Sequence, residues 1–250
     1  MRLAPFALFC LTLAGQSLNQ DKEAALGRAL AEDVDRHTTP VQAPEVQNYV
    51  AQLGAKITAQ LPAPSRSFTF SVVSTGEDNA LHEPLAIPGG YIFVPSNLLL
   101  TARDEAEFAG MLAQAMARVP VLIQSSAGTI PLVYVDSFDS GPMPIGMIDR
   151  RRERELQADS SAILLLSRAG FDPAALLRYV ERVQPLDRPR SPFPARADRI
   201  AALQKAIGDL PPASYSESGE FYAIQEQVRV LPPPPPTHPP TLFRKSDPPK

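Results

Sequence analysis

Hydrophobic residues recur at intervals of three and four along much of the chain, the spacing of one face of an amphipathic helix. The first such segment starts at Asp21, and its apolar residues fall on one stripe: Ala25, Leu26, Leu30, Ala31 and Val34. A second starts at Pro44, since proline favours the first position of a helix. Its apolar residues also share a face: Val46, Tyr49, Val50, Leu53 and Ile57. Both stripes predict helices packed on a core.

Two later segments predict β-strands. The run FTFSVVS (68–74) alternates and is rich in β-branched and aromatic residues, and YIFV (91–94) follows the turn sequence Pro88-Gly89-Gly90. Two strands among amphipathic helices predict an α+β fold, mostly helical with a small sheet.

A further helix is predicted to begin at Thr101, a favourable N-cap, and to end or kink at Pro120. Residues 121–148 contain glycine and proline without sustained periodicity, which indicates a loop with one strand at LVYV. The next helix is predicted from about Asp149 to Ala169, ending at Gly170, and Asp172-Pro173 then indicates the start of another.

The helix at 149–169 carries an unusual pair of acids. Glu155 and Asp159 are four residues apart, and the same spacing continues into Ala162 and Leu166. The pair therefore either faces the core or forms an exposed acidic edge beside the charged run DRRRERE, and periodicity leaves both interpretations open.

Both ends of the chain differ from its middle. MRLAPFALFCLTLAGQS has the order of a secretory signal peptide, with cleavage expected near Gly15 to Ser17; an N-terminal core helix is the alternative. The C-terminal LPPPPPTHPPTLFRKSDPPK predicts an extended, disordered proline-rich tail. The predicted organisation is a signal peptide over 1–17, one domain over 18–230 and a tail over 231–250, in an exported periplasmic or extracellular protein.

Net charge and cysteine content exclude some classes of partner and of metal site. The net charge of -3 gives no basic field for nucleic acid, and no transmembrane span is expected after signal cleavage. Cys10, the only cysteine, lies in the signal segment, so the mature chain would have neither a disulfide nor a cysteine metal site.

Six segments, in order, resemble a known family. They are EAALGRALAEDV, EVQNYVAQLGAKI, NALHEPLAIPGGYIFVPSNLLL, DEAEFAGMLAQAMARV, ERELQADSSAILLLSRAGFDPAALL and SPFPARADRIAAL. The family is the zinc metallopeptidases that include the HtpX heat-shock protease, the CAAX prenyl protease, the Oma-type protease and the periplasmic β-barrel-assembly-enhancing protease. The resemblance covers roughly residues 21 to 210 and implies a zincin-like metallopeptidase fold.

In this family an HExxH helix supplies two zinc-binding histidines and a catalytic glutamate, and a later glutamate supplies the third ligand. The resemblance places the third ligand at Glu155 and a supporting acid at Asp159. The HExxH positions, however, are occupied by Gln114, Ala115 and Arg118, which offer neither imidazole nor a general base. Without zinc, the pKa of a water molecule stays far above neutral, whereas zinc lowers it to about 7. We therefore expect no bound metal and no catalytic residue.

A different interpretation would rebuild a zinc site from His37, His82 or His238, giving a zinc-dependent endopeptidase of envelope protein quality control with unusual ligands. A further alternative is an unrelated helical structural domain. If the family fold is kept, an ion pair between Arg118 and Glu155, joined by Asp159, is predicted to replace the metal. Otherwise Arg118 would extend into solvent and the acids would bind water.

An inactive protease can still bind peptides, because substrates of such enzymes add to a sheet edge through backbone hydrogen bonds. The predicted peptide-binding edge is Gly89, Gly90, Tyr91, Ile92, Phe93 and Val94, unless the 121–148 loop covers it. The expected function is that of a catalytically inactive pseudoprotease that binds a peptide or protein.

Overall fold

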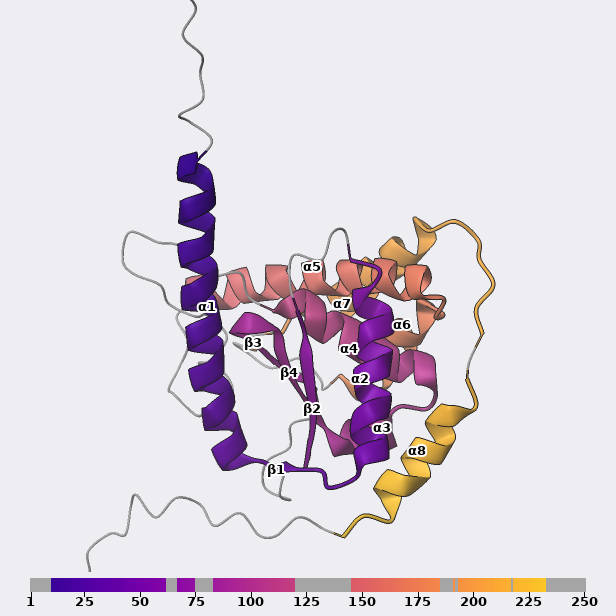
Figure 1. The fold of residues 1–250 in the computed structure, drawn as a ribbon. Helices are drawn as coiled ribbons and strands as arrows, with labels where there is room; N and C mark the ends of the chain where they lie inside the picture. Colours follow the sequence, from indigo (N-terminus) through magenta and orange to yellow (C-terminus); the bar gives the residue numbers. More distant parts are fainter. Residues whose placement is uncertain are drawn as a thin grey trace, which may run out of the picture.

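The computed structural model describes residues 10–61, 67–74, 83–119, 145–184, 191, 193–216 and 218–232. Helices surround a small mixed sheet, so the predicted α+β class is confirmed (Figure 1). The helices are α1 Cys10–His37, α2 Pro44–Thr58, α3 Ser96–Thr101, α4 Glu105–Arg118, α5 Ile145–Ala169, α6 Ala174–Val183, α7 Arg196–Gly208 and α8 Glu220–Arg229. The strands are β1 Thr39–Pro40, β2 Thr69–Ser74, β3 Leu85–Ile87 and β4 Tyr91–Pro95.

The sheet has the strand order β1-β2-β4-β3. Strand β2 runs parallel to β4, and β3 is antiparallel to β4 with Leu85 opposite Phe93. The two strands predicted from the sequence, β2 and β4, are confirmed. Strand β3 was not predicted, because three residues between two prolines are fewer than a strand pattern needs.

The predicted peptide-binding edge, Gly89 to Val94, is wrong. Strand β4 is hydrogen-bonded on both sides, so its backbone groups are already paired. Gly89 and Gly90 have φ values of 79° and 83° and form the turn that folds β3 back onto β4, a conformation that favours glycine. Among the described residues, the strand at this end of the sheet is therefore β3.

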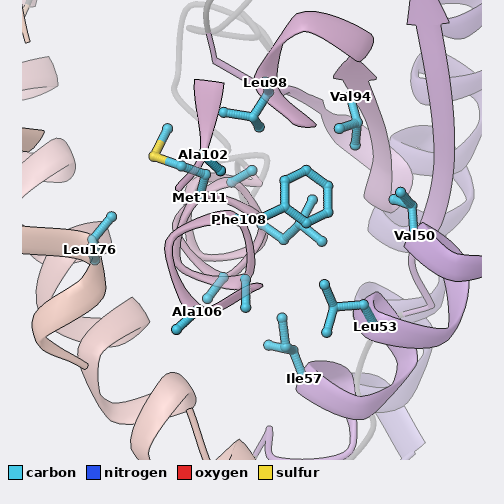
Figure 2. Packing of buried hydrophobic residues seen from close by; sticks show 14 of the residues in the cluster. Val50, Leu53, Ile57, Val94, Leu98, Ala102, Ala106, Phe108, Met111 and Leu176 are labelled. Carbon is cyan, nitrogen blue, oxygen red and sulfur yellow. The ribbon is translucent and has the colours of Figure 1, made fainter. Parts of the chain in front are cut away.

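The sheet has apolar side chains on both faces. In β4, Ile92 and Val94 belong to the main core, whereas Phe93 belongs to a second cluster, as expected from the alternation of side chains along a strand. Figure 1 shows α1 on one side of the sheet and α2 on the other. Figure 2 shows the Phe108 ring of α4 between α2 and β4, near Val50 and Val94.

Helix α1 covers the second face of the sheet. Its residues Leu30, Ala31 and Val34 pack with Ile87 and Phe93, among others. The helix predicted from Asp21 is present, but it begins earlier than predicted, at Cys10. Among the described residues, none of the helices combines the length and apolar character needed to cross a membrane. Residues 1–9 lie outside the described residues, whereas residues 10–17 belong to α1. The signal peptide over 1–17 stays a prediction.

The start of α4 differs from the prediction. Thr101 is the last residue of α3, where its hydroxyl donates to the Asn97 carbonyl. Asp104 is the N-cap of α4 instead, and its carboxylate accepts a 2.7 Å hydrogen bond from the Glu107 backbone N–H. Aspartate caps a helix at least as well as threonine, because its carboxylate accepts a hydrogen bond from the backbone N–H three residues later.

The second half of the chain is helical. Helix α5 begins at Ile145, earlier than predicted, and ends before Gly170, whose φ of 80° terminates it as expected. Residues 120–144, which include LVYV, and the tail residues 233–250 lie outside the described residues. Helix α8, which was not predicted, packs on the main core through Phe221, Ile224 and Val228.

Candidate functional site

Helices α4 and α5 pack against each other and bring the predicted site residues together. Gln114 from α4 and Glu155 and Asp159 from α5 are buried, with exposed fractions of 0%, 3% and 0%. The interpretation of the two acids as core-facing is therefore confirmed, and the exposed acidic edge is wrong. Three polar side chains in such a place require partners, because an unpaired buried charge costs several kcal/mol.

Gln114 connects the two acids through its side-chain amide. Its Nε2 donates to Glu155 Oε2 at 3.1 Å and to Asp159 Oδ1 at 3.2 Å. Its Oε1 accepts a hydrogen bond from Arg118 Nη2. The neutral amide thus presents its donors to the carboxylates and its acceptor to the guanidinium.

Arg118 turns inward and contacts two acids. Its Nε lies 3.5 Å from Glu155 Oε2, and its Nη2 donates to Glu83 Oε2 at 2.6 Å. The structure thus brings together the pair predicted from the sequence, although the shorter contact is made with Glu83. The arginine side chain is 15% exposed, so it does not extend into solvent.

Asp159 is paired with a residue that the sequence analysis missed. Arg199 of α7 is 1% exposed and donates from Nε to Asp159 Oδ2 at 2.7 Å and from Nη2 to Oδ1 at 3.0 Å. Such a bidentate pair is both strong and geometrically specific. Asp159 joins Arg118 through Gln114 rather than directly. A weak signal for Arg199 was present, since it precedes Leu203 by four residues and shares its buried face.

Glu83, just before β3, was also missed. Burial raises the pKa of its carboxyl, but the positive charges of Arg118, Arg199 and Arg151 outweigh burial and lower the pKa below its usual value. The same attraction raises the pKa of the Arg118 guanidinium, although burial alone would lower it. Glu83 is therefore ionised at neutral pH, and nothing in the local sequence indicated its partners.

Arg151 completes the group. Its Nε lies 3.9 Å from Glu155 Oε1, and its guanidinium stacks on the Phe193 ring at 5.5 Å. We call the whole group the acid–arginine cluster: Glu83, Gln114, Arg118, Arg151, Glu155, Asp159 and Arg199. Three carboxylates and three guanidiniums balance, so the buried cluster carries no net charge.

The side chains at these positions do not fit a zinc ion. Gln114 directs N–H groups at the acids, Arg118 is a cation in contact with Glu155, and Ala115 carries no polar group. In the described part of the chain, no three His, Cys, Asp or Glu side chains are arranged to hold a metal. The side chain of His37 and the residues His82 and His238 lie outside the described residues.

Comparison with known proteins shows which proteins the chain is similar to. No protein-family model matches the chain. A Vibrio cholerae protein assigned as a beta-barrel assembly-enhancing protease is 24% identical across 87% of this chain and 50% of its own length. The beta-barrel assembly-enhancing protease of Escherichia coli K12 is 22% identical over the same shares. That of Yersinia pestis is 24% identical across 69% of this chain and 40% of its own length.

The chain is a relative of the beta-barrel assembly-enhancing proteases. The metallopeptidase family predicted from the six sequence segments is thereby confirmed. The chain spans about half the length of the curated relatives it matches.

Proposed function

We propose that this chain is an exported, zincin-like pseudoprotease that binds peptide or protein segments without hydrolysing them, in envelope protein quality control. The observation that supports this proposal is the acid–arginine cluster. At the positions where the family binds zinc, the Gln114 amide and the Arg118 guanidinium make hydrogen bonds and ion pairs with the acids.

The chemistry of hydrolysis is missing from these residues. A metallopeptidase needs a metal-activated water and a carboxylate that accepts its proton. Ala115 occupies the position of that carboxylate, and Glu155 already binds Gln114 and lies beside two arginines. We therefore expect neither zinc nor turnover.

Peptide binding at a sheet edge requires neither a metal nor a general base. The end strand of the sheet, β3, contacts α4, and the outer edge of an end strand can add a further strand through backbone hydrogen bonds alone. A peptide bound in this way would lie beside the acid–arginine cluster, because Glu83 precedes β3 by two residues.

The first experiment measures zinc. The mature chain from residue 18 is exposed to zinc, dialysed and subjected to elemental analysis, and hydrolysis of an unfolded casein is followed in parallel. We expect zinc at the level of the dialysis buffer and no cleavage. The matched positive control is the triple variant Gln114→His, Ala115→Glu, Arg118→His, which restores the family's ligand types on the same helix.

The competing function, a zinc endopeptidase with unusual ligands, makes the opposite prediction. Stoichiometric zinc and casein cleavage in the unmodified chain, both lost in Glu155→Ala, would overturn the proposal. Binding of the same unfolded casein without cleavage, measured by sedimentation, is the positive result that the pseudoprotease function requires.

A further inference from the structure

Glu83 differs from the other two acids of the cluster. It is held by the segment that leads into β3 rather than by a helix, and its side chain is 27% exposed, against 4% for Glu155 and 0% for Asp159. It is therefore the acid that can leave the cluster with the least disturbance of the core.

Two guanidiniums lie against the Glu83 carboxylate, and the charge of a third acts on it. Arg118 of α4 donates to it at 2.6 Å, and Arg199 Nη1 of α7 lies 4.0 Å from its Oε1. The charge of Arg151 on α5 also favours its ionised form. Guanidiniums converging on one carboxylate are the usual means by which proteins bind that group.

Two of the arginines have contacts besides Glu83 that hold their side chains. Arg199 is fixed by its bidentate pair with Asp159. Arg118 is hydrogen-bonded to Gln114 and lies beside Glu155. Without the Glu83 carboxylate, the cluster would hold three guanidiniums and two carboxylates, which leaves one positive charge in a mostly buried place. The remaining groups would thus attract one external carboxylate.

A second observation comes from α6. The Tyr179 side chain is 2% exposed, and its hydroxyl has no hydrogen-bond partner among the described residues. Burial, together with the charge of Glu83, raises the pKa of this tyrosine, so the hydroxyl stays protonated near the carboxylate. A buried O–H without a partner is a donor that a ligand oxygen could use.

We propose that Arg118, Arg151 and Arg199 form a carboxylate-binding site whose resident ligand is Glu83, and that a carboxylate of a bound peptide occupies it by replacing Glu83. This inference rests on the proposed peptide-binding function and names the chemical group that is recognised. Leu85, where β3 begins, is two residues from Glu83, which corresponds to roughly 7 Å of extended chain. A peptide added to β3 can therefore reach the site.

The first test removes the resident carboxylate and supplies acetate as the probe. Four proteins are unfolded by heat in acetate and in chloride at equal ionic strength. They are the mature wild-type chain, Glu83→Ala, the double variant Glu83→Ala with Arg118→Gln, and the control Glu153→Ala. Circular dichroism is the readout, because the chain has no tryptophan. Glu153 is exposed on α5, outside the cluster.

We expect Glu83→Ala to melt below wild type in chloride and to gain several degrees in acetate, since a ligand stabilises the state that binds it. Wild type and Glu153→Ala should change little, and the gain should disappear when Arg118→Gln is added. An equal response of all four proteins, or no response of Glu83→Ala, overturns the carboxylate site. If Glu83→Ala folds only in acetate, the same conclusion follows as from a gain in Tm.

The second test identifies the source of the carboxylate. One probe is acetylated tetra-alanine with a free C-terminus; another is a peptide capped at both ends that carries one internal glutamate; a fully capped tetra-alanine is the neutral control. We expect Glu83→Gln to bind one acidic probe at least about tenfold more tightly than wild type, a difference of about 1.4 kcal/mol. The preferred probe shows whether a C-terminus or an acidic side chain is recognised.

The two proposals fail in different ways. If all three peptides bind equally to wild type and to Glu83→Gln, peptide binding stands and the carboxylate site is overturned. If acetate stabilises Glu83→Ala but neither the casein nor any peptide binds, the anion site stands, and peptide binding and replacement of Glu83 by a peptide are both overturned.

Discussion

The side-chain amide of Gln114 lies 3.1 Å from the Glu155 carboxylate, across the interface between α4 and α5. In the family that the chain resembles, these two positions supply two ligands of one zinc ion. In this chain a hydrogen bond joins the two helices at these positions. The contribution of such contacts to the free energy of unfolding can be measured by substitution of single residues of the cluster.

Replacing Arg118 by methionine should destabilise the protein strongly. The change removes the guanidinium that contacts Glu83 and Glu155, and breaking a buried pair costs roughly 3 to 5 kcal/mol because a charge stays buried without a partner. Urea unfolding followed by circular dichroism measures the loss. Arg178→Met is the matched control, since Arg178 is 44% exposed and its pairs with Asp104 and Asp172 should contribute about 1 kcal/mol or less. Losses of similar size in both variants would contradict the assignment.

The pair Asp159 and Arg199 should behave as a unit. Asp159→Asn and Arg199→Met each leave one buried group unpaired, so each single change should cost about 3 to 5 kcal/mol. The double variant should cost clearly less than the sum, because neither charge then remains. A double-mutant cycle in urea gives the coupling energy. Strictly additive losses would mean that the two side chains do not interact in solution.

Glu83 should make stability depend on pH in the acid range. Its folded pKa is lowered, so its contribution is complete above its unfolded pKa of about 4.3 and is lost as the pH falls through the folded value. The difference in unfolding free energy between wild type and Glu83→Gln should therefore be largest near neutral pH and shrink toward acid. A difference that stays constant from pH 7 to the acid limit would show that the Glu83 charge is not paired.

Gly27 should tolerate no side chain. A Cβ at this position would lie 2.2 Å from the Pro88 carbonyl oxygen, so α1 would have to move away from the turn between β3 and β4. We expect Gly27→Ala to cost about 1 to 3 kcal/mol, the usual effect of overpacking. Gly208→Ala is the control, because nothing lies within 4 Å of its Cβ and the change should be neutral or slightly stabilising. The melting temperatures of Gly27→Ala and Gly208→Ala, each compared with wild type, test this prediction. Equal melting temperatures of the two variants would contradict it.

The sequence pattern predicted those features of the fold that are determined by neighbouring residues along the chain. The Gly170 signal marked the end of α5. The spacing of Glu155, Asp159, Ala162 and Leu166 left two interpretations open, and the structure shows that this face is buried. The partners of the buried acids could not be predicted in this way. An arginine on a helix such as Arg199 looks the same in sequence whether it faces water or a carboxylate 40 residues away.

Strand β3 shows the same limit for a backbone element. Its three residues form a strand only because the Gly89-Gly90 turn folds them onto β4. No periodicity can be read over three positions, so the identity of the sheet edge was assigned to the wrong strand. The candidate residues from α4 and α5 were identified from family motifs, whereas Glu83, Arg151 and Arg199 required the tertiary structure.

The balanced charges of the acid–arginine cluster also limit which single substitutions such a protein can accept without losing stability. A single Arg118→His substitution would supply one zinc-ligand type, but it would remove the guanidinium that contacts both Glu83 and Glu155, at a cost in stability. Restoring His at position 114 as well would still leave Glu83 without its nearest guanidinium. Any path from this cluster to a metal site that changes positions 114 and 118 one at a time is therefore expected to pass through less stable intermediates.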